Sequence, residues 1–283
     1  MALSQVVTSG AVLLSANPTT RAFGGQSMNT TSPSQTVTIT NTSVGSVAVG
    51  SIVAPQGFSA SHNCGTLAPL ATCTATIAFK PDVQGPMDNF LAILHPGGGP
   101  TTVALTGTGE KSLVTHYYRS ILRRAPDAGG KTFWEGEAVR VSGLGTNVNE
   151  TWFAMAQSFY SSTEYAAFNR ANAAFVTDLY NTFFNRAPDS AGLDFWVNNL
   201  ASGMPREVGL AEFMFSAEFK SFAQAIFGNT AARAEVDTVV DFYRGLLARL
   251  PDDGGFNHWV GRFRTAQCQG SAAIVGEVEA ISS

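Results

Sequence analysis

The sequence predicts a multidomain β plus α chain, in which a β-sandwich is followed by an all-α helical repeat region. Two patterns carry this prediction. Short alternating polar and apolar segments occupy roughly the first hundred residues, and one helical motif then recurs three times. Length is a third argument, because 283 residues exceed what one hydrophobic core usually serves. With 45% hydrophobic and 13% charged residues, the composition is that of a folding chain.

Four segments of the first part have the pattern of strands. Residues 36–40 alternate strictly, which places Val37 and Ile39 on one face. Residues 74–79, 90–94 and 102–106 fit the same pattern, and glycine and proline turn signals at 81–86 and 97–99 separate them. Short strands at this close spacing predict a sandwich.

The three cysteines form an odd set, because Cys64 and Cys73 are close in sequence and Cys268 stands alone. We expect a disulfide between the first two, which would stabilise the fold by roughly 2.7 kcal/mol in the chain-entropy model. Such a bond indicates an oxidising compartment. The alternative is a pair of buried thiols in a cytosolic protein.

Short motifs in a fixed order join the strands. They are FGG at 23–25, TITNT at 38–42, CGTLAP at 64–69 followed by Cys73, FKP at 79–81 and LTGTG at 105–109. This ordered set resembles the bacterial choice-of-anchor D immunoglobulin-like domain, related to the ASPM/SPD-2/hydin group. The resemblance covers residues 15–109 and implies an immunoglobulin-like β-sandwich, mostly non-catalytic in that family. Residues 1–14 are then a leader or an added stretch, and a linker at 107–111 leads to the helical region at 110–283.

Three segments of the second part superimpose without gaps, at 118–134, 180–196 and 243–259. Each has Tyr, Arg, Pro-Asp, Gly and Trp at the same spacing. The recurring residues are Pro126, Asp127 and Trp134, then Pro188, Asp189 and Trp196, then Pro251, Asp252 and Trp259. The repeats span about 113–170, 171–230 and 231–283. A Ser-x-Glu-aromatic element closes the first two, at 162–165 and 216–219, and we expect the third to be truncated before it.

The repeated residues have a structural explanation. An amphipathic helix precedes each Pro-Asp, with Val176, Leu179, Tyr180 and Phe183 on one face in the second copy. The proline is expected to end that helix, the aspartate to cap the next one, and the glycine and tryptophan to set close packing in the core. Neighbouring copies are expected to share a core.

This pattern resembles the bacterial domain-of-unknown-function family 4214 over residues 113–283. That family occurs in tandem in large secreted, surface-layer-like and haemolysin-type calcium-binding proteins. The resemblance therefore implies a bacterial protein that is secreted or held at the cell surface.

Calcium is the one metal for which the sequence offers candidate ligands. These are Asp189 and Asp194, and both are weak candidates. The position of Asp194 becomes Thr132 and Asn257 in the other copies, so the ligand set is not sustained and capping is favoured for Asp189. The histidines do not fall at metal-ligand spacing. We expect no cofactor and no other metal.

Trp152 differs from the repeated tryptophans. Aligned on the Ser-x-Glu-aromatic elements, it lies opposite Arg206, so the shared core does not require it. We expect an exposed or interdomain position and a possible role in stacking on a ligand.

The sequence argues against several function classes. A net charge of -4 without a basic stripe excludes nucleic acid, and no apolar run is long enough for a membrane span. Without a nucleophile elbow or a phosphate-binding loop, no catalytic residue is predicted. We predict a non-enzymatic secreted or cell-surface module for adhesion, display or binding of an extracellular glycan or surface protein.

Two alternatives remain open. The first is an extracellular polysaccharide hydrolase with a carboxylate pair in an interdomain or inter-repeat cleft. Glu135, Glu137 and Glu150 are unrepeated acids that could contribute to it. The second is a subunit that self-associates into a surface layer or filament.

Overall fold

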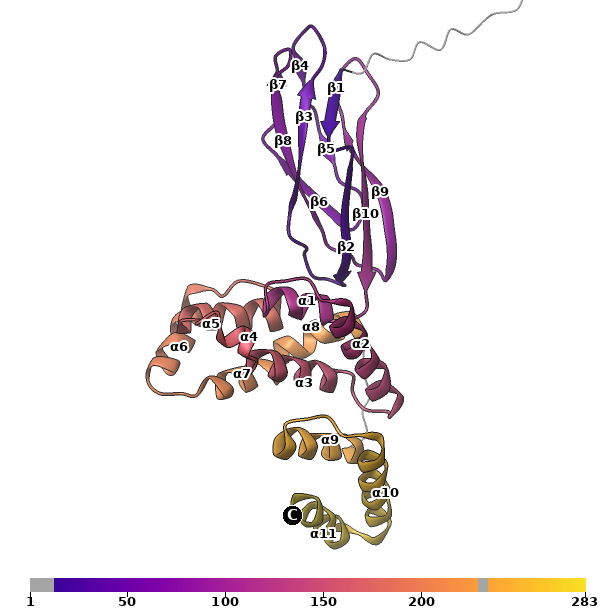
Figure 1. Cartoon of the computed structure of the whole chain (residues 1–283), viewed down its shortest axis with the longest axis vertical. Helices are drawn as coiled ribbons and strands as arrows, with labels where there is room; N and C mark the ends of the chain where they lie inside the picture. Colours follow the sequence, from indigo (N-terminus) through magenta and orange to yellow (C-terminus); the bar gives the residue numbers. More distant parts are fainter. Residues whose placement is uncertain (1–12, 229–233) are drawn as a thin grey trace, which may run out of the picture. The chain divides into compact units, whose positions relative to one another are not determined.

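The computed structural model describes residues 13–228 and 234–283 (Figure 1). It consists of two compact units, Met1–Lys111 and Ser112–Ser283. The predicted class is confirmed, since the first unit is built of strands and the second of helices. Residues 1–12, which form most of the predicted leader, and the expected repeat boundary at 230–231 lie outside the described residues.

The first unit is a β-sandwich of two facing sheets (Figure 1). One sheet has the order β1-β3-β8-β6 and the other β2-β10-β9-β5, while β4 and β7 pair as a short ribbon. The strands are β1 (Leu14–Asn17), β2 (Thr20–Ser27), β3 (Gln35–Asn41), β4 (Val47–Ala48), β5 (Ile52–Val53), β6 (Phe58–His62), β7 (Thr66–Leu67), β8 (Thr72–Phe79), β9 (Gly85–Ile93) and β10 (Thr101–Glu110).

The alternating pattern determines which side chains enter the sandwich core. Val37 and Ile39 of β3 are fully buried and lie opposite Ala75 and Cys73 of the antiparallel strand β8. Since successive side chains of a strand point to opposite faces, the intervening threonines face away from this core. The four predicted strand segments correspond to β3, β8, β9 and β10, although β9 ends at Ile93, one residue before the predicted end of its segment.

The predicted linker at 107–111 is wrong for most of its length. Residues 107–110 continue β10, which pairs with β9 as far as Gly109 and with β2 as far as Glu110. Strand β2 is parallel to β10 and was missing from the prediction because Gly24 and Gly25 interrupt its alternation. Only Lys111 to Leu113 then separate β10 from the first helix.

The disulfide expected between Cys64 and Cys73 is present, with the two Cα atoms 5.1 Å apart. It joins the segment after β6 to β8, so it holds one end of a central strand to its neighbour. Cys268 is a free, exposed thiol in the helical unit.

Replacing both disulfide cysteines with serine (C64S/C73S) is expected to lower the unfolding free energy of the sandwich by about 2.5 kcal/mol, because the unfolded chain loses a closed loop. Hydrogen exchange of the β3 and β8 amides, followed by mass spectrometry, measures the change. Dithiothreitol should produce the same loss in C268S, which keeps the disulfide as its only cysteine pair. Unchanged exchange after reduction would contradict this account.

In the described residues of the second unit, all regular secondary structure is helical. Its elements are α1 (Val114–Ser120), α2 (Ala128–Gly143), α3 (Asn149–Tyr160), α4 (Thr163–Ala166), α5 (Asn172–Leu179), a π-helical turn η1 (Tyr180–Phe184), α6 (Ser190–Ala201), α7 (Arg206–Met214), α8 (Ala217–Phe227), α9 (Ala234–Leu247), α10 (Asp253–Gln269) and α11 (Ser271–Ser282). Among these described helices, none is both long and apolar enough to cross a membrane.

The prolines do not end the first helix of each copy, contrary to the prediction. In every copy a left-handed residue lies three positions before the proline and turns the chain: Arg123, Asn185 and Ala248, with φ of 59°, 52° and 50°. The amide that follows then bonds back to the tyrosine carbonyl, as from Arg124 to Tyr118 at 3.2 Å. This left-handed closure is a common helix ending, but glycine is its usual residue, so Arg123 and Ala248 do not indicate it.

The first two copies share a core, as aromatic contacts across their boundary show. Tyr117 of α1 meets Phe183 of η1 edge to face at 6.1 Å, and Tyr160 of α3 stacks on Phe183 at 6.3 Å. The buried His116 donates from Nε2 to the carbonyl of Thr182 at 2.8 Å. Burial lowers the pKa of His116 to about 4, so the ring is neutral at pH 7.

The third copy has a core of its own. Buried residues of α9, including Val236 and Val239, pack with Phe256 and Phe263 of α10. Apolar side chains of α11 cover part of this cluster.

Candidate functional site

The repeated aspartates cap helices. Asp127 accepts a hydrogen bond from the amide of Gly130 at 2.8 Å, at the start of α2. Asp189 and Asp252 make the same 2.8 Å contact with Gly192 and Gly255. These amide bonds lower the pKa of all three carboxyl groups below the usual value.

The repeated glycines allow the tyrosines to pack against the capped turn. A Cβ added at Gly192 would lie 2.2 Å from the hydroxyl of Tyr180, and the corresponding distances are 1.9 Å at Gly130 and 2.0 Å at Gly255. The position just before is less demanding, since it is Ala191 in the second copy and glycine in the other two. The motif glycine is therefore required because any side chain there would clash with the tyrosine hydroxyl, and not because the backbone conformation demands glycine.

The repeated arginines join each motif to its closing element. Arg124 lies over the Tyr118 ring at 4.8 Å and bonds both oxygens of Glu164, at 2.7 and 3.1 Å. Arg186 lies over Tyr180 in the same way and bonds Glu218 at 2.7 and 3.0 Å. The Ser-x-Glu-aromatic elements are thus the partners of the motif arginines.

The repeated tryptophans lie within α2, α6 and α10 and are half-buried, so they are less enclosed than the prediction of a core position implied. Trp134 meets Phe159 edge to face at 6.2 Å, and Trp196 lies 5.1 Å from Phe213. Trp259 packs on the core of the third copy.

Trp152 is not an exposed platform, and this expectation is corrected. Its side chain is 1% exposed and stacks on Phe227 of α8 at 5.4 Å. This position does not follow the repeat pattern because its surroundings are a contact between copies, in which α3 of the first copy packs against α8 of the second. Aligning single copies with one another does not reveal such a contact.

Asp189 is engaged as a cap, and its second oxygen lies 3.7 Å from Arg186. Within the described residues, no group of three or more His, Cys, Asp or Glu side chains is placed to hold a metal ion.

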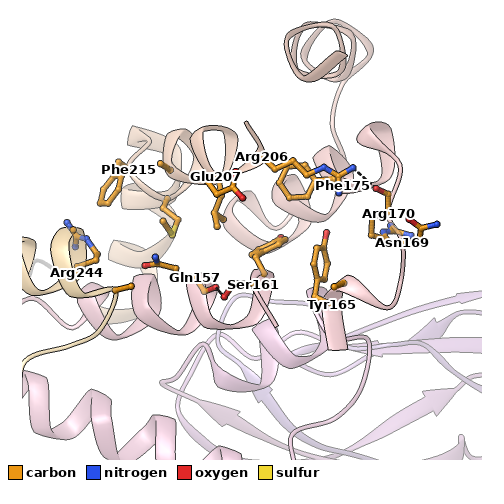
Figure 2. A pocket seen from close by; sticks show the side chains of 17 residues that line it. Gln157, Ser161, Tyr165, Asn169, Arg170, Phe175, Arg206, Glu207, Phe215 and Arg244 are labelled. Atoms are coloured by element: carbon orange, nitrogen blue, oxygen red, sulfur yellow. Dashed lines mark hydrogen bonds between the residues drawn. The ribbon is translucent and has the colours of Figure 1, made fainter. Parts of the chain in front are cut away.

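A groove of about 740 Å³ runs along α3, α4, α5, α7 and α9. Aromatic and aliphatic side chains form much of its wall, and three arginines enter it, so we call it the arginine groove (Figure 2). Its main lining residues are Tyr160, Tyr165, Phe175, Leu210, Met214 and Phe215, with Arg170, Arg206, Arg244, Gln157, Asn169 and Glu207.

Behind Arg170 lies a buried ionic cluster centred on Asp178, whose side chain is 2% exposed. Arg170 bonds both carboxylate oxygens at 2.8 and 2.9 Å, Arg123 bonds one at 2.6 Å, and the Tyr165 hydroxyl donates at 3.0 Å. Burial and the nearby carboxylate raise the pKa of Tyr165 well above its usual value, which keeps the phenol protonated. One carboxylate thus faces two guanidinium groups, leaving a net positive charge on this wall.

Arg206 is the least neutralised charge in the groove. Its Nη2 donates to the carbonyl of Arg170 and to Oδ1 of Asn172, both neutral acceptors, and its guanidinium stacks on Phe175 at 4.9 Å (Figure 2). Among the described residues, no carboxylate bonds to it. It is also the first residue of α7, where the helix dipole is positive and a cation is unfavourable. Helix stability therefore does not explain an arginine here.

Arg244, at the other end of the groove, has carboxylate partners. It stacks on Phe215 at 4.8 Å and pairs with Glu150 and Asp241. Burial raises the pKa of Glu150 to about 7, although Arg244 acts in the opposite direction. Glu207 is the one carboxylate among the residues described as lining the groove.

Sequence reasoning missed Arg170, Asp178 and Arg206 as site residues. A signal was present for Arg206, which aligns with Trp152 and so does not recur. Asp178 aligns with His116 in the first copy, but Arg170 and Asp178 both recur in the sequence of the third copy, as Arg233 and Asp241. Positions that a repeat leaves free are where one copy can acquire a property of its own.

Comparisons with known families match two parts of the chain. The model described as Abnormal spindle-like microcephaly-associated, ASPM-SPD-2-Hydin, matches residues 10–103, and the Domain of unknown function DUF4214 matches residues 156–223. Both resemblances are thereby confirmed for these segments. The second match runs from the end of α3 into α8, so its unit begins before the expected boundary at 171.

Solved structures show weaker similarity. The VesB protease of Vibrio cholerae is 20% identical with a TM-score of 0.29, over 34% of this chain and 32% of that one. A protein of unknown function from Porphyromonas gingivalis W83 is 15% identical with a TM-score of 0.30, over 35% of this chain and 47% of that one. The ASH/PapD-like domain of human CEP192 is 17% identical with a TM-score of 0.31, over 39% of this chain and 96% of that one. This chain thus spans about a third to a half of the first two proteins. No curated protein matches the sequence.

Proposed function

For a chain that joins an ASPM-SPD-2-Hydin domain to a DUF4214 segment, we propose a non-enzymatic bacterial module, secreted or at the cell surface, that binds an anionic glycan in the arginine groove. Adhesion or display would follow from this binding. The disulfide supports an extracytoplasmic location, because such bonds persist in oxidising compartments.

The observation that carries the proposal is the charge of Arg206. A half-buried guanidinium held by two neutral acceptors keeps its positive charge directed at the groove. The Asp178 cluster supplies a second unbalanced positive charge, because Arg123 and Arg170 share the single carboxylate of Asp178. Carboxylate and sulfate groups bind guanidinium in the paired geometry that these side chains offer.

The apolar part of the groove suits the rings of a sugar polymer. Tyr160, Tyr165 and Phe215 lie in the same groove as the arginines, and its size is that of a typical ligand site. Aromatic faces with a few placed charges are the usual composition of such sites.

The hydrolase alternative finds less support. The acids considered for it have basic partners: Glu135 lies 3.9 Å from Lys131, Glu137 bonds Arg140 at 2.8 Å, and Glu150 pairs with Arg244. A glycosidase needs two carboxyl groups facing one cleft, and Glu207 is the one such group described in the arginine groove.

Titration calorimetry of the full chain with polygalacturonate, dextran sulfate and neutral dextran tests the proposal. We expect binding to at least one anionic polymer and none to neutral dextran. Arg206→Ala should weaken the binding about tenfold, the loss of one charge-assisted contact.

Arg262→Gln is the matched control, because Arg262 is a surface arginine of the third copy that pairs with Glu277. It should leave the affinity unchanged. Equal binding by Arg206→Ala and the wild type, or no binding to either anionic polymer, would refute the proposed site.

A further inference from the structure

A smaller pocket, of about 350 Å³, lies on the second copy among η1, α6 and α7. We call it the aromatic pocket, because its main lining residues are Phe184, Trp196, Phe213 and Phe215, with Glu212. Phe213 is 1% exposed and contacts two of the other rings, since Phe184 stacks on it at 4.8 Å and Trp196 lies at 5.1 Å. The residues described as lining the pocket all belong to the second copy, whose closing element is present.

Glu212 supplies the charge of the aromatic pocket. It is exposed, and among the described residues no basic group pairs with it. It also lies in the last turn of α7, where the helix dipole is negative and a carboxylate is unfavourable. Helix stability therefore does not explain a glutamate here, whereas a bound cation would.

The two arginines nearest to the aromatic pocket do not cancel this charge. Arg186 lies 5.6 Å from the ring centroid of Phe184 and pairs with Glu218. Arg244 lies 4.8 Å from that of Phe215 and pairs with two carboxylates. Both arginines are thus neutralised by partners of their own, and the charge left at the pocket is negative.

The first copy shows which lining residues the repeat itself requires. Trp196 and Phe213 recur there, as a tryptophan and a phenylalanine that also contact each other. The other three do not recur, because the residues aligned with Phe184, Glu212 and Phe215 are Leu122, Ser158 and Ser161. The second copy therefore has two additional rings and a carboxylate, gathered at one place on a scaffold that folds without them.

We propose that the aromatic pocket binds a trimethylammonium group, with the rings against its methyl groups and Glu212 as its counter-ion. A quaternary ammonium is attracted to the faces of aromatic rings, and this attraction is its usual mode of recognition. It has no N–H to donate, so it suits a pocket that offers rings and one carboxylate. The pocket volume lies in the range of small-molecule sites. Free choline and the phosphatidylcholine headgroup both carry this group.

Titration of the ¹⁵N-labelled full chain with choline chloride, followed by NMR, tests the proposal. The chain has four tryptophans, and the indole signals of Trp134 and Trp196 are assigned by their loss in the phenylalanine variants. We expect a saturable shift of the Trp196 signal and an unchanged Trp134 signal, because the first copy lacks the additional rings and the carboxylate. The uncharged isostere 3,3-dimethyl-1-butanol, with carbon in place of the nitrogen, should bind about tenfold more weakly or less.

Variants of the chain separate the two parts of the pocket. Glu212→Gln should weaken choline binding about fivefold and leave binding of the isostere unchanged. Phe184→Leu, which introduces the residue of the first copy, should weaken choline binding about three- to fivefold. Glu279→Gln is the matched control, because it removes an exposed carboxylate of α11, and it should behave like the wild type. Circular dichroism verifies that each variant is folded.

Vesicles of phosphatidylcholine distinguish the two sources of the group. Sedimentation of the chain with these vesicles, reduced in Glu212→Gln, would assign the site to a lipid headgroup. Choline binding without such sedimentation would assign it to a free ligand.

Three outcomes would overturn the proposal. They are no saturable shift with millimolar choline, equal affinity for choline and its uncharged isostere, or a Trp134 shift as large as that of Trp196. Phe215 is left unchanged in these tests because it also lines the arginine groove. None of the results bears on Arg206, so the glycan proposal stands or falls separately.

Discussion

Replacing Arg123 and Arg170 together with alanine is expected to destabilise the helical unit by about 3–4 kcal/mol. The double variant leaves Asp178, 2% exposed, with the Tyr165 hydroxyl as its remaining described donor. An unpaired buried carboxylate is among the most costly defects a core can carry. Urea unfolding followed by tryptophan fluorescence measures the change, because every tryptophan lies in this unit.

Asp178→Asn is the informative comparison for this cluster. It removes the charge that is buried and leaves the two arginines, 42% and 24% exposed, free to turn towards water. Its cost is therefore expected to be smaller, about 1–2 kcal/mol. A loss in Asp178→Asn that equals or exceeds that of the double variant would mean that arginine solvation, and not carboxylate burial, dominates the cluster.

The cluster also explains how one copy is attached to the next. Tyr165, Arg170 and Asp178 all lie within residues 156–223, the segment that the DUF4214 model matches, whereas Arg123 comes from the preceding copy, so the Arg123–Asp178 pair joins the two. In a repeat protein the interface between neighbours carries much of the stability, so the double variant should also make unfolding less cooperative.

Replacing Gly130 and Gly192 together with alanine is expected to cost about 4 kcal/mol, or about 2 kcal/mol per site. Each new Cβ would lie within 2.2 Å of a tyrosine hydroxyl. Tyr180 has little room to retreat, because Phe184, Phe213 and Arg186 surround its ring at 4.9 to 5.3 Å. Forcing atoms into such a packed site costs about 1–3 kcal/mol. Thermal and urea unfolding of the full chain measure the effect.

The preceding position is the natural control for the two glycines. A Cβ at Gly129 would meet nothing closer than 3.5 Å, and the second copy already has Ala191 there. Gly129→Ala should therefore stabilise slightly, by about 0.5–1 kcal/mol, through helix propensity. Tyr118→Phe should relieve part of the loss in Gly130→Ala. If Gly129→Ala loses a similar amount of unfolding free energy, then glycine is required because of its place at the start of the helix and not because of the tyrosine.

The sequence was sufficient for features that depend on local pattern. Alternation at Val37 and Ile39 indicated a buried strand face, and the spacing of Asp127 from Gly130 predicted a helix cap. Strand β2 was missed because its glycines conceal a pairing with β10 that lies far away in sequence. Helix ends were misassigned to proline because Arg123 and Ala248 give no sign of left-handed backbone.

The candidate site could be predicted only in part, because it depends on contacts between copies. Trp152 was correctly set apart from the shared core, but its burial against Phe227 required the placement of α8. The same alignment placed Arg206 at a free position without indicating that Phe175 and the Arg170 carbonyl would hold it at a groove. Repeat comparison thus locates where a site can lie, and tertiary packing decides which residue forms it.

The parallel pairing of β2 with β10 has a mechanical consequence. Residues 20–27 and 104–110 run side by side in the same direction, so tension between the start of β2 and the end of β10 pulls the two strands past each other along their length. The hydrogen bonds between them are then loaded in shear and must break together, not one after another as in peeling. Tension that enters through β10 is therefore expected to meet a stiff element before it can extend the sandwich.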